Sequence, residues 1–182
     1  MSTVTNSNAN PNYRFIEPLA VPDARIVLKT RNFSGNNPGK FDRPDQRGRM
    51  PRHFSILLDP EKFDIPKLQD IGWNIKIGKP NPEDPDYVPG FYLRVHADWY
   101  DADEPRFKFN PIVFKVNSEG QTQLDADTIK ELDNAEIEMA NMTITGRWME
   151  SPSYTGVVAY LKKMAVKVSE DEDMSDLFEG MI

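Results

Sequence analysis

The sequence predicts a mainly β protein, a small barrel of about seven strands with one or two short helices. Fifteen prolines and ten glycines are spread over 182 residues between short apolar runs, which is typical of a chain with many turns. Several runs alternate apolar and polar residues, the period of a strand with one buried face. Short strands at regular turns favour a barrel or a sandwich, and two short helical stretches suit a barrel whose ends they cover.

One domain is expected, because 182 residues can bury a substantial core. Residues 1–12 are rich in Ser, Thr and Asn without periodicity and are predicted to form a flexible arm. The domain is expected over 13–168, followed by a disordered acidic tail over 169–182. No apolar run approaches the roughly 20 residues that span a bilayer, so we expect no membrane partner. The absence of cysteine and the presence of only two histidines predict no metal and no cofactor.

The first half of the chain predicts three strands and a helix. Residues 24–33 alternate as a strand with one basic face, and 34–51 form a long loop with several Gly and Pro residues. His53–Leu58 is the second strand. A helix is expected within 59–72, with Asp64 as its N-cap and Gly72 as its stop. Residues 73–78 then form a half-buried strand that turns Trp73, Ile75 and Ile77 inward.

The second half predicts four more strands. Residues 91–99 turn Tyr92, Arg94 and His96 outward, and 107–116 form the next strand. A turn at 117–122 leads to a short helix over 125–133, with Ile129 and Leu132 inward. Two long strands, 137–148 and 157–168, flank a loop that contains Pro152 and Gly156.

Charge is unevenly distributed along the chain. The segment 25–52 carries eight Lys or Arg residues and two acids, whereas the whole chain has a net charge of -7. The last fourteen residues contain six acids and no base. A basic segment together with an acidic tail indicates a protein that binds a polyanion. The alternative is that the loop is an ordinary solvated surface and that the tail serves solubility alone.

Aromatic and basic residues are interleaved in a way that favours binding of single-stranded nucleic acid. Single strands are held by cations along the phosphates and by rings that stack on bases, at about 1–3 kcal/mol per base. Residues two apart in a strand share a face, as in the pairs Arg31/Phe33, Arg52/Phe54 and Tyr92/Arg94. We predict that Phe54, Phe91, Phe107 and Phe114 belong to the core. The predicted nucleic-acid-binding residues are Arg31, Phe33, Lys40, Arg43, Arg47, Arg49, Arg52, Trp73, Lys76, Tyr92, Arg94, Trp99, Lys108, Arg147, Trp148 and Tyr154.

The acidic tail has a second possible role. Asp176, Leu177 and Phe178 combine charge with apolar side chains, as a docking peptide for a protein partner requires. The same tail could compete with DNA for the basic segment. Two other functions are considered: an adaptor that makes protein contacts only, and a metal-dependent nuclease built on Asp98, Asp101, Asp103 and Glu104.

Several short motifs carry a family resemblance in their order along the chain. They are Gly39-Lys40-Phe41, Arg52-His53-Phe54, DIGWNIK (70–76), YLRV (92–95), LDNAEI (132–137), TITGRWME (143–150) and GVVAYLKKMAV (156–166). With them the sequence resembles the OB-fold single-stranded-DNA-binding proteins of bacteriophages.

This resemblance implies an OB-like barrel that is not an enzyme. It further implies binding of single-stranded DNA without strong sequence preference, during replication, recombination or repair of phage DNA. The tail would recruit replication or recombination proteins. The expected state is a monomer or homodimer, in the cytoplasm of the infected bacterial host.

Overall fold

The computed structural model describes residues 14–27, 49–79, 82–83, 89–100, 102–133 and 135–169. Within them, seven strands have four or more residues: β4 (His53–Leu58), β5 (Ile75–Gly78), β6 (Gly90–His96), β8 (Ile112–Asn117), β9 (Gly120–Leu124), β10 (Ile137–Glu150) and β11 (Thr155–Val168). Four are shorter: β1 (Leu19–Val21), β2 (Arg25–Ile26), β3 (Arg49–Met50) and β7 (Trp99–Tyr100). The helices are α1 (Ile65–Ile71) and the 3₁₀ segments η2 (Pro105–Phe109) and η3 (Ile129–Asp133). The prediction of a mainly β chain is confirmed.

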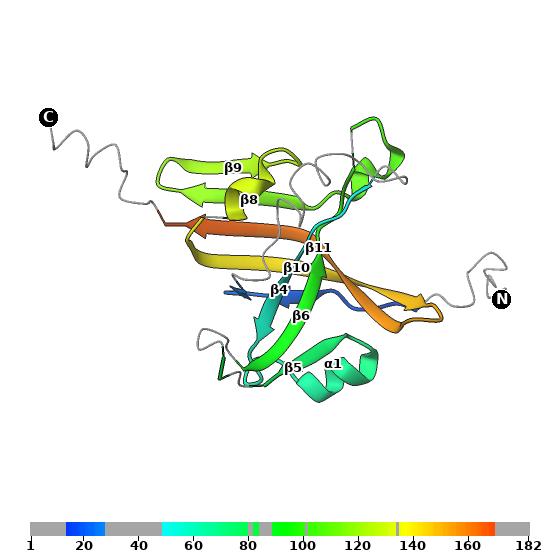
Figure 1. Ribbon diagram of the computed structural model, residues 1–182. Coiled ribbons are helices and arrows are strands. Elements are labelled where there is room, and N and C mark those ends of the chain that lie inside the picture. The colour runs from blue at the N-terminus through cyan, green and yellow to red at the C-terminus, as the bar shows by residue number, and fades with distance from the viewer. Residues whose placement is uncertain are drawn as a thin grey trace, which may run out of the picture.

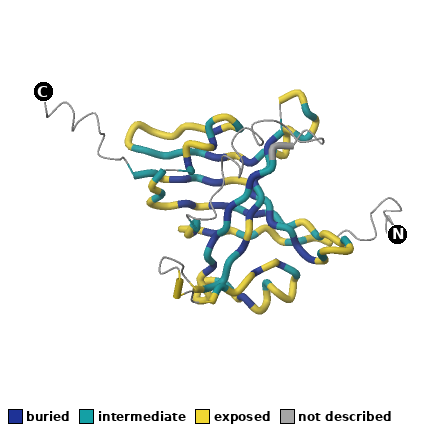
Figure 2. The backbone as a smooth tube through the Cα atoms, viewed as in Figure 1, coloured by how far each residue is buried: buried dark blue, intermediate teal, exposed yellow. Residues whose placement is uncertain are grey.

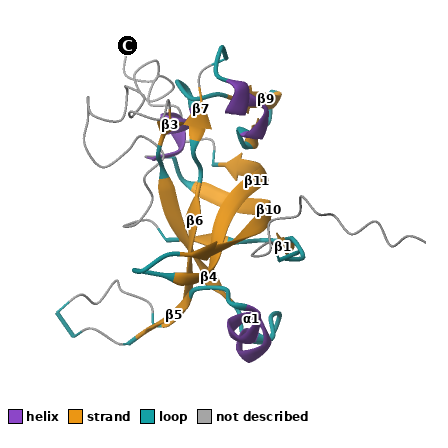
Figure 3. Ribbon diagram, turned by 90° about the vertical axis from the view of Figure 1, so that its right-hand side faces the viewer, coloured by secondary structure: helices purple, strands orange, loops and turns teal. Residues whose placement is uncertain are grey.

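Nine strands form one strongly curved sheet, with the order β1-β10-β11-β6-β4-β2 (Figure 1). β5 adds to β6, and the β8–β9 hairpin adds to β11. β11 pairs antiparallel with β10 and parallel with both β6 and β8. β3 and β7 form a separate two-stranded ribbon beyond the end of β6 (Figure 3). Among the described residues no continuous ladder closes the sheet, and the Ala24 N–H donates to the Ala140 carbonyl near its open seam.

The core lies where β4, β6, β10 and β11 cross (Figure 2). β4 alternates strictly, with Phe54, Ile56 and Leu58 buried, because successive side chains of a strand point to opposite faces. Leu93 and Val95 of β6 are buried in the same way. The outward positions of these two strands are therefore free to be polar, and they become the functional surface described below.

Helix α1 begins and ends at the residues that the sequence predicts. The Asp64 carboxylate accepts a hydrogen bond from the Lys67 amide at 3.2 Å and so caps the helix. Gly72 ends it in the left-handed conformation, with φ of 119°. A side chain at Gly72 would also clash with the Trp148 ring, since a Cβ there would lie 2.7 Å from Trp148 Cζ3. The end of α1 thus fixes the position of Trp73 beside β10.

Three predictions about local structure are wrong. Residues 107–109 belong to the 3₁₀ segment η2 and not to a strand, since Pro105 starts a helical turn and Pro111 cannot donate to a ladder. Phe107 is therefore 47% exposed instead of buried. Ile77 is 65% exposed, because β5 ends at Gly78 on the rim of the sheet. One strand was also missed: β9 is polar and exposed at four of its five positions, so it has no alternating pattern.

The last predicted elements are largely confirmed. The stretch 125–133 forms the 3₁₀ segment η3 in place of an α-helix, with Ile129 and Leu132 buried as expected. The two long strands extend by two residues on either side of their connecting loop. Of the strand predicted over 24–33, only Arg25–Ile26 is observed as β2, and its remainder from 28 onward lies outside the described residues.

Candidate nucleic-acid interface

The outward face of β6 carries Tyr92, Arg94 and His96, as the sequence predicts. Leu93, Val95 and Ala97 between them are buried at 1% exposure or less. Because the two faces of a strand alternate, the three polar side chains share the opposite side of the sheet. They are the starting point of the interface.

Strand register extends this face with a row of rings. His96 lies opposite His53 of β4 and beside Tyr160 of β11. The ring centroids of His96 and His53 are 6.3 Å apart in an edge-to-face arrangement, and those of His96 and Tyr160 are 5.7 Å apart. These distances lie in the range of favourable ring pairs. Three neighbouring strands therefore present a continuous row of planar side chains.

A set of cations flanks the row of rings. Lys76 of β5 lies opposite Tyr92, and Arg147 of β10 lies opposite Val158, the residue of β11 that neighbours Arg94 in register. Lys76, Arg94 and Arg147 are all exposed. Within the described part of the chain their side chains form no ion pair. We call this surface the ring-and-cation face; it comprises His53, Lys76, Tyr92, Arg94, His96, Arg147 and Tyr160.

His53 is held in its neutral form by its surroundings. Burial lowers the pKa of its imidazole, and the electrostatic influence of Arg94 and then of His96 lowers it further, while Asp98 partly opposes them. The Nδ1 atom of His53 is buried and has no hydrogen-bond partner among the described residues. The ring therefore acts at neutral pH as an uncharged planar surface next to a cation.

A small hollow opens beside Arg94. β6 pairs with β5 through Gly90–Leu93 and with β11 through Val95 and His96, so these two neighbours part on either side of Arg94. We call this hollow the β5–β11 notch. It has a volume of about 200 Å³ and is lined by Asn74, Leu93, Arg94, His96, Tyr154, Val157, Val158 and Ala159.

Two further predicted residues adjoin this region. Tyr154 lines the notch, and its hydroxyl donates to the Val157 carbonyl at 3.0 Å; burial raises the pKa of this phenol. Trp148 lies on the other face of β10, half-buried, with its Nε1–H donating to Glu150 Oε1 and the Arg14 guanidinium 4.0 Å from its ring centroid. Only the first of the two faces the notch.

Three predicted DNA-binding side chains lie in the interior. Trp73 and Trp99 are 4% and 3% exposed and belong to the core. Arg52 is 3% exposed, and its Nη1 donates to the Ala126 carbonyl at 2.8 Å. The guanidinium thus ties the start of β4 to the turn before η3. In this conformation none of the three offers a surface to a nucleic acid.

The remaining predicted residues lie elsewhere. Lys108 is on η2, with its ammonium 5.1 Å from the centroid of the exposed Phe109 ring. The backbone of Arg49 pairs with Tyr100 in the β3–β7 ribbon. Outside the described residues lie Arg31, Phe33, Lys40, Arg43, Arg47, Asp176, Leu177 and Phe178.

Sequence reasoning missed three rings of the interface. His53 and His96 each alternate outward in their strands, and this signal identifies them once imidazoles are counted among the planar rings that can stack on bases. Tyr160 carries no such signal, because the run 157–161 (VVAYL) has apolar residues on both faces of β11 and therefore shows no period-two pattern.

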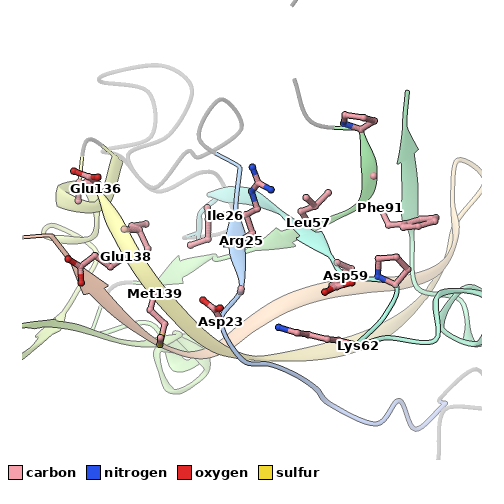
Figure 4. Close-up of a pocket in the computed structure, with 17 residues that line it drawn as sticks. Asp23, Arg25, Ile26, Leu57, Asp59, Lys62, Phe91, Glu136, Glu138 and Met139 are labelled. Atoms are coloured by element: carbon pink, nitrogen blue, oxygen red, sulfur yellow. The ribbon is translucent and has the colours of Figure 1, made fainter. Parts of the chain in front are cut away.

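A larger cavity, of about 1080 Å³, shares no lining residue with the ring-and-cation face or the notch. It lies between β2, the end of β4, the start of β6 and the start of β10 (Figure 4). Its charged lining residues are four acids and two bases: Asp23, Asp59, Glu136, Glu138, Arg25 and Lys62. This excess of negative charge does not favour a polyanion.

The carboxylates considered for a nuclease do not form a metal site in the described part of the chain, where no group of three or more potential ligands is found. Glu104 pairs instead with Arg106 at 2.8 Å, and Asp101 lies outside the described residues. Among the described helices, none has the length and apolarity needed to cross a membrane.

Comparison with known proteins identifies relatives of this fold. A family model for the phage ssDNA-binding domain matches residues 8–177. Among solved structures, the C-terminally truncated single-stranded DNA-binding protein from bacteriophage Enc34 is similar, with a TM-score of 0.52 and 12% identity over 85% of this chain and 86% of that chain. The same phage protein in complex with ssDNA gives a TM-score of 0.52 and 12% identity, over 85% of this chain and 88% of that one. No curated protein sequence matches the chain. The predicted OB-like, mainly β fold is confirmed.

Proposed function

Because this chain belongs to the phage ssDNA-binding domain family, we propose that it binds single-stranded DNA, and does so on its ring-and-cation face. The family is one of DNA-binding proteins, in agreement with the prediction that the chain is not an enzyme. The observation that carries the proposal is the row His53–His96–Tyr160, flanked by cations that form no ion pair among the described residues. A likeness to a phage protein solved in complex with ssDNA supports it.

In the proposed mechanism, the rings and the cations of the face bind different parts of the DNA strand. Bases stack on the half-buried rings of the face, while Lys76, Arg94 and Arg147 contact the phosphates. The basic segment 25–52 adds further cations, chiefly Arg31, Lys40, Arg43, Arg47 and Arg49. Because most of this attraction is electrostatic, affinity falls steeply as salt is raised.

The biological setting forms a second part of the proposal. The protein covers single strands of phage DNA during replication, recombination or repair in the cytoplasm of the infected host, as a monomer or homodimer. The acidic tail recruits replication or recombination proteins through Asp176, Leu177 and Phe178, and competes with DNA when no strand is bound. Its six acids and its Leu–Phe pair support this role.

Fluorescence anisotropy with labelled oligo-dT tests the proposed function. We expect binding at low salt, a linear fall of log Kobs with log salt, and weaker binding to a duplex of equal length. Absence of salt-dependent binding to oligo-dT would overturn the proposal. Nucleic-acid-independent capture of replication proteins by the same preparation would then favour the adaptor alternative.

A further inference from the structure

The β5–β11 notch is a built feature of the sheet and not a gap between mobile side chains. β4 occupies one edge of β6 from Phe91 to His96, so β5 and β11 must share the other edge. A bridge between Trp73 and Val157 holds the two neighbours together behind the notch, and the Val157 N–H donates to the Gly72 carbonyl at 2.8 Å. The walls of the notch are therefore fixed by backbone hydrogen bonds.

The lining separates into an apolar floor and a polar rim. Leu93, Val157 and Ala159 are core residues, at most 2% exposed, and they close the notch at its bottom. Asn74 and Arg94 are exposed on the rim, and Tyr154 is held there by the hydrogen bond from its hydroxyl to the Val157 carbonyl. An apolar floor with a few convergent polar groups is the usual character of a ligand site.

The size of the notch limits its occupant to one ring system. Its volume of about 200 Å³ is below the roughly 300–1,000 Å³ of clefts that enclose whole small ligands. The notch also opens on the ring-and-cation face, since Arg94 and His96 belong to both. A strand whose phosphates follow that face would pass over the notch, so the occupant that continuity favours is a single nucleobase.

We propose that the notch binds one base of the bound strand and prefers guanine there. Arg94 offers a fork of donors that matches guanine O6 and N7, the commonest specific contact between a protein and a base. Asn74 adds an amide oxygen that can accept from the N1–H and amino group of the same base. Thymine and cytosine are smaller and lack the adjacent O6 and N7 acceptors. This inference rests on the proposed function and adds one position of base preference to otherwise nonspecific binding.

The test compares oligo-dT with the same oligonucleotide carrying one central dG, at a single salt concentration, by fluorescence anisotropy with full-length protein. We expect the dG to tighten binding at least about fivefold, the lower end of what one bidentate pair supplies. Replacing dG by 7-deaza-dG removes the N7 acceptor and should abolish most of the gain in the wild-type protein. Arg94→Lys keeps the charge but loses the fork, and Asn74→Ala removes the amide; both should lose the preference while still binding oligo-dT.

Arg147→Lys is the matched control, because Arg147 lies on the same face but does not line the notch. It should keep the preference for dG. Equal affinity for the two oligonucleotides, or a preference that survives both 7-deaza-dG and Arg94→Lys, would overturn the inference and leave the proposed function intact. Failure to bind any oligonucleotide at low salt would overturn both.

Discussion

Arg94 occupies the one exposed position of β6, between Tyr92 and His96 in the strand and at the mouth of the notch. Its guanidinium forms no ion pair within the described residues. A cation kept free of carboxylates retains its full charge for an external partner, which is typical of a phosphate contact. Arg147 and Lys76 are likewise exposed and form no ion pair within the described residues.

Removing one of these cations should therefore change the salt dependence of DNA binding. For Arg94→Ala or Arg147→Ala, we expect weaker binding to oligo-dT and a slope of log Kobs against log salt that is smaller by about 0.7, the value for one phosphate contact on a single strand. Lys130→Ala is the control, since Lys130 is exposed on η3 and outside the face. Anisotropy titrations at several salt concentrations measure the slope. A slope unchanged in Arg94→Ala and Arg147→Ala would contradict a phosphate contact by these residues.

His53 should give the protein a distinct response to acid. Its pKa is lowered in the folded state, chiefly by burial, so the unfolded chain binds the proton more readily. Stability from this group is present above the unfolded pKa of about 6.5 and is lost as the pH falls towards the lower folded pKa. Wild-type protein should therefore lose more melting temperature than His53→Gln between about pH 7.5 and about pH 5.5. Equal losses measured by circular dichroism would show that His53 does not contribute.

For single residues, the sequence predicts which face of a strand a side chain points to better than it predicts how exposed that side chain is. Period-two alternation correctly turns Tyr92 and Arg94 outward, because the pattern depends only on neighbouring residues. It cannot show that Trp73 and Trp99 lie beneath other elements, since their burial comes from residues far away in the chain. Arg52 shows this limit most clearly. Its hydrogen-bond partner, the Ala126 carbonyl, is 74 residues away in the chain, and no local sequence pattern indicates that contact.

The β10–β11 hairpin is the element that shapes the notch, through Gly156 at the start of β11. This glycine has a φ of 152°, and a Cβ there would lie 2.6 Å from the Tyr154 hydroxyl and 2.9 Å from the Gly72 carbonyl. Any side chain at this position would push the wall of the notch away from α1. The start of β11 and the C-terminal end of α1 are thus in close backbone contact, between Gly156 and Gly72.

Gly156→Ala should destabilise the protein by more than backbone strain alone. Gly120→Ala is the matched control, because Gly120 also has a positive φ, of 125°, but a Cβ at this position would meet no atom of the described residues within 4 Å. We expect about 1–3 kcal/mol for the strain that both share, and a further loss only in Gly156→Ala. Urea unfolding with an unchanged m-value measures the difference. Similar midpoints for the two variants would mean that the crowding relaxes without cost.

Element boundaries follow from local chemistry where a cap or a proline sets them. Asp64 and Gly72 identify the ends of α1 because their hydrogen bonds lie within the helix itself. β9 has no comparable signal: its polar residues form a strand only because β8 offers an edge to pair with. The notch escapes sequence analysis for the same reason, since it depends on two strands parting along a third.

At the scale of the whole molecule, the hydrogen bonds of the β domain extend to Ser169. The Ser169 N–H donates to the Glu136 carbonyl at 2.8 Å, and its hydroxyl contacts Glu138. A truncation that tests the tail should therefore keep Ser169 and remove residues 170–182, so that this anchor of β11 is preserved.

We expect the truncated protein to keep its melting temperature and to bind oligo-dT more tightly at low salt, because an acidic competitor is gone. A full-length variant with Asp171 and Asp173 changed to Asn and Glu172 to Gln separates charge from chain length, and it should gain part of the same affinity. Anisotropy at low and high salt compares the three proteins, and the gain should shrink at high salt. An affinity that does not change on truncation would remove competition by the tail from the proposed function.

The central position of β11 in the sheet affects how the protein folds during its synthesis. This strand pairs with β10, β6 and β8, yet it is the last of the described strands in chain order. During synthesis one edge of β8 is unpaired, as is the part of β6 at Val95 and His96 that β5 does not cover, and both stay so until β11 follows. Folding of the sheet must therefore wait for nearly the whole domain, and the long separation between paired strands makes closure slow. The nascent chain is open to edge-to-edge association during that interval, a hazard that pairing with β11 removes for β6 and β8.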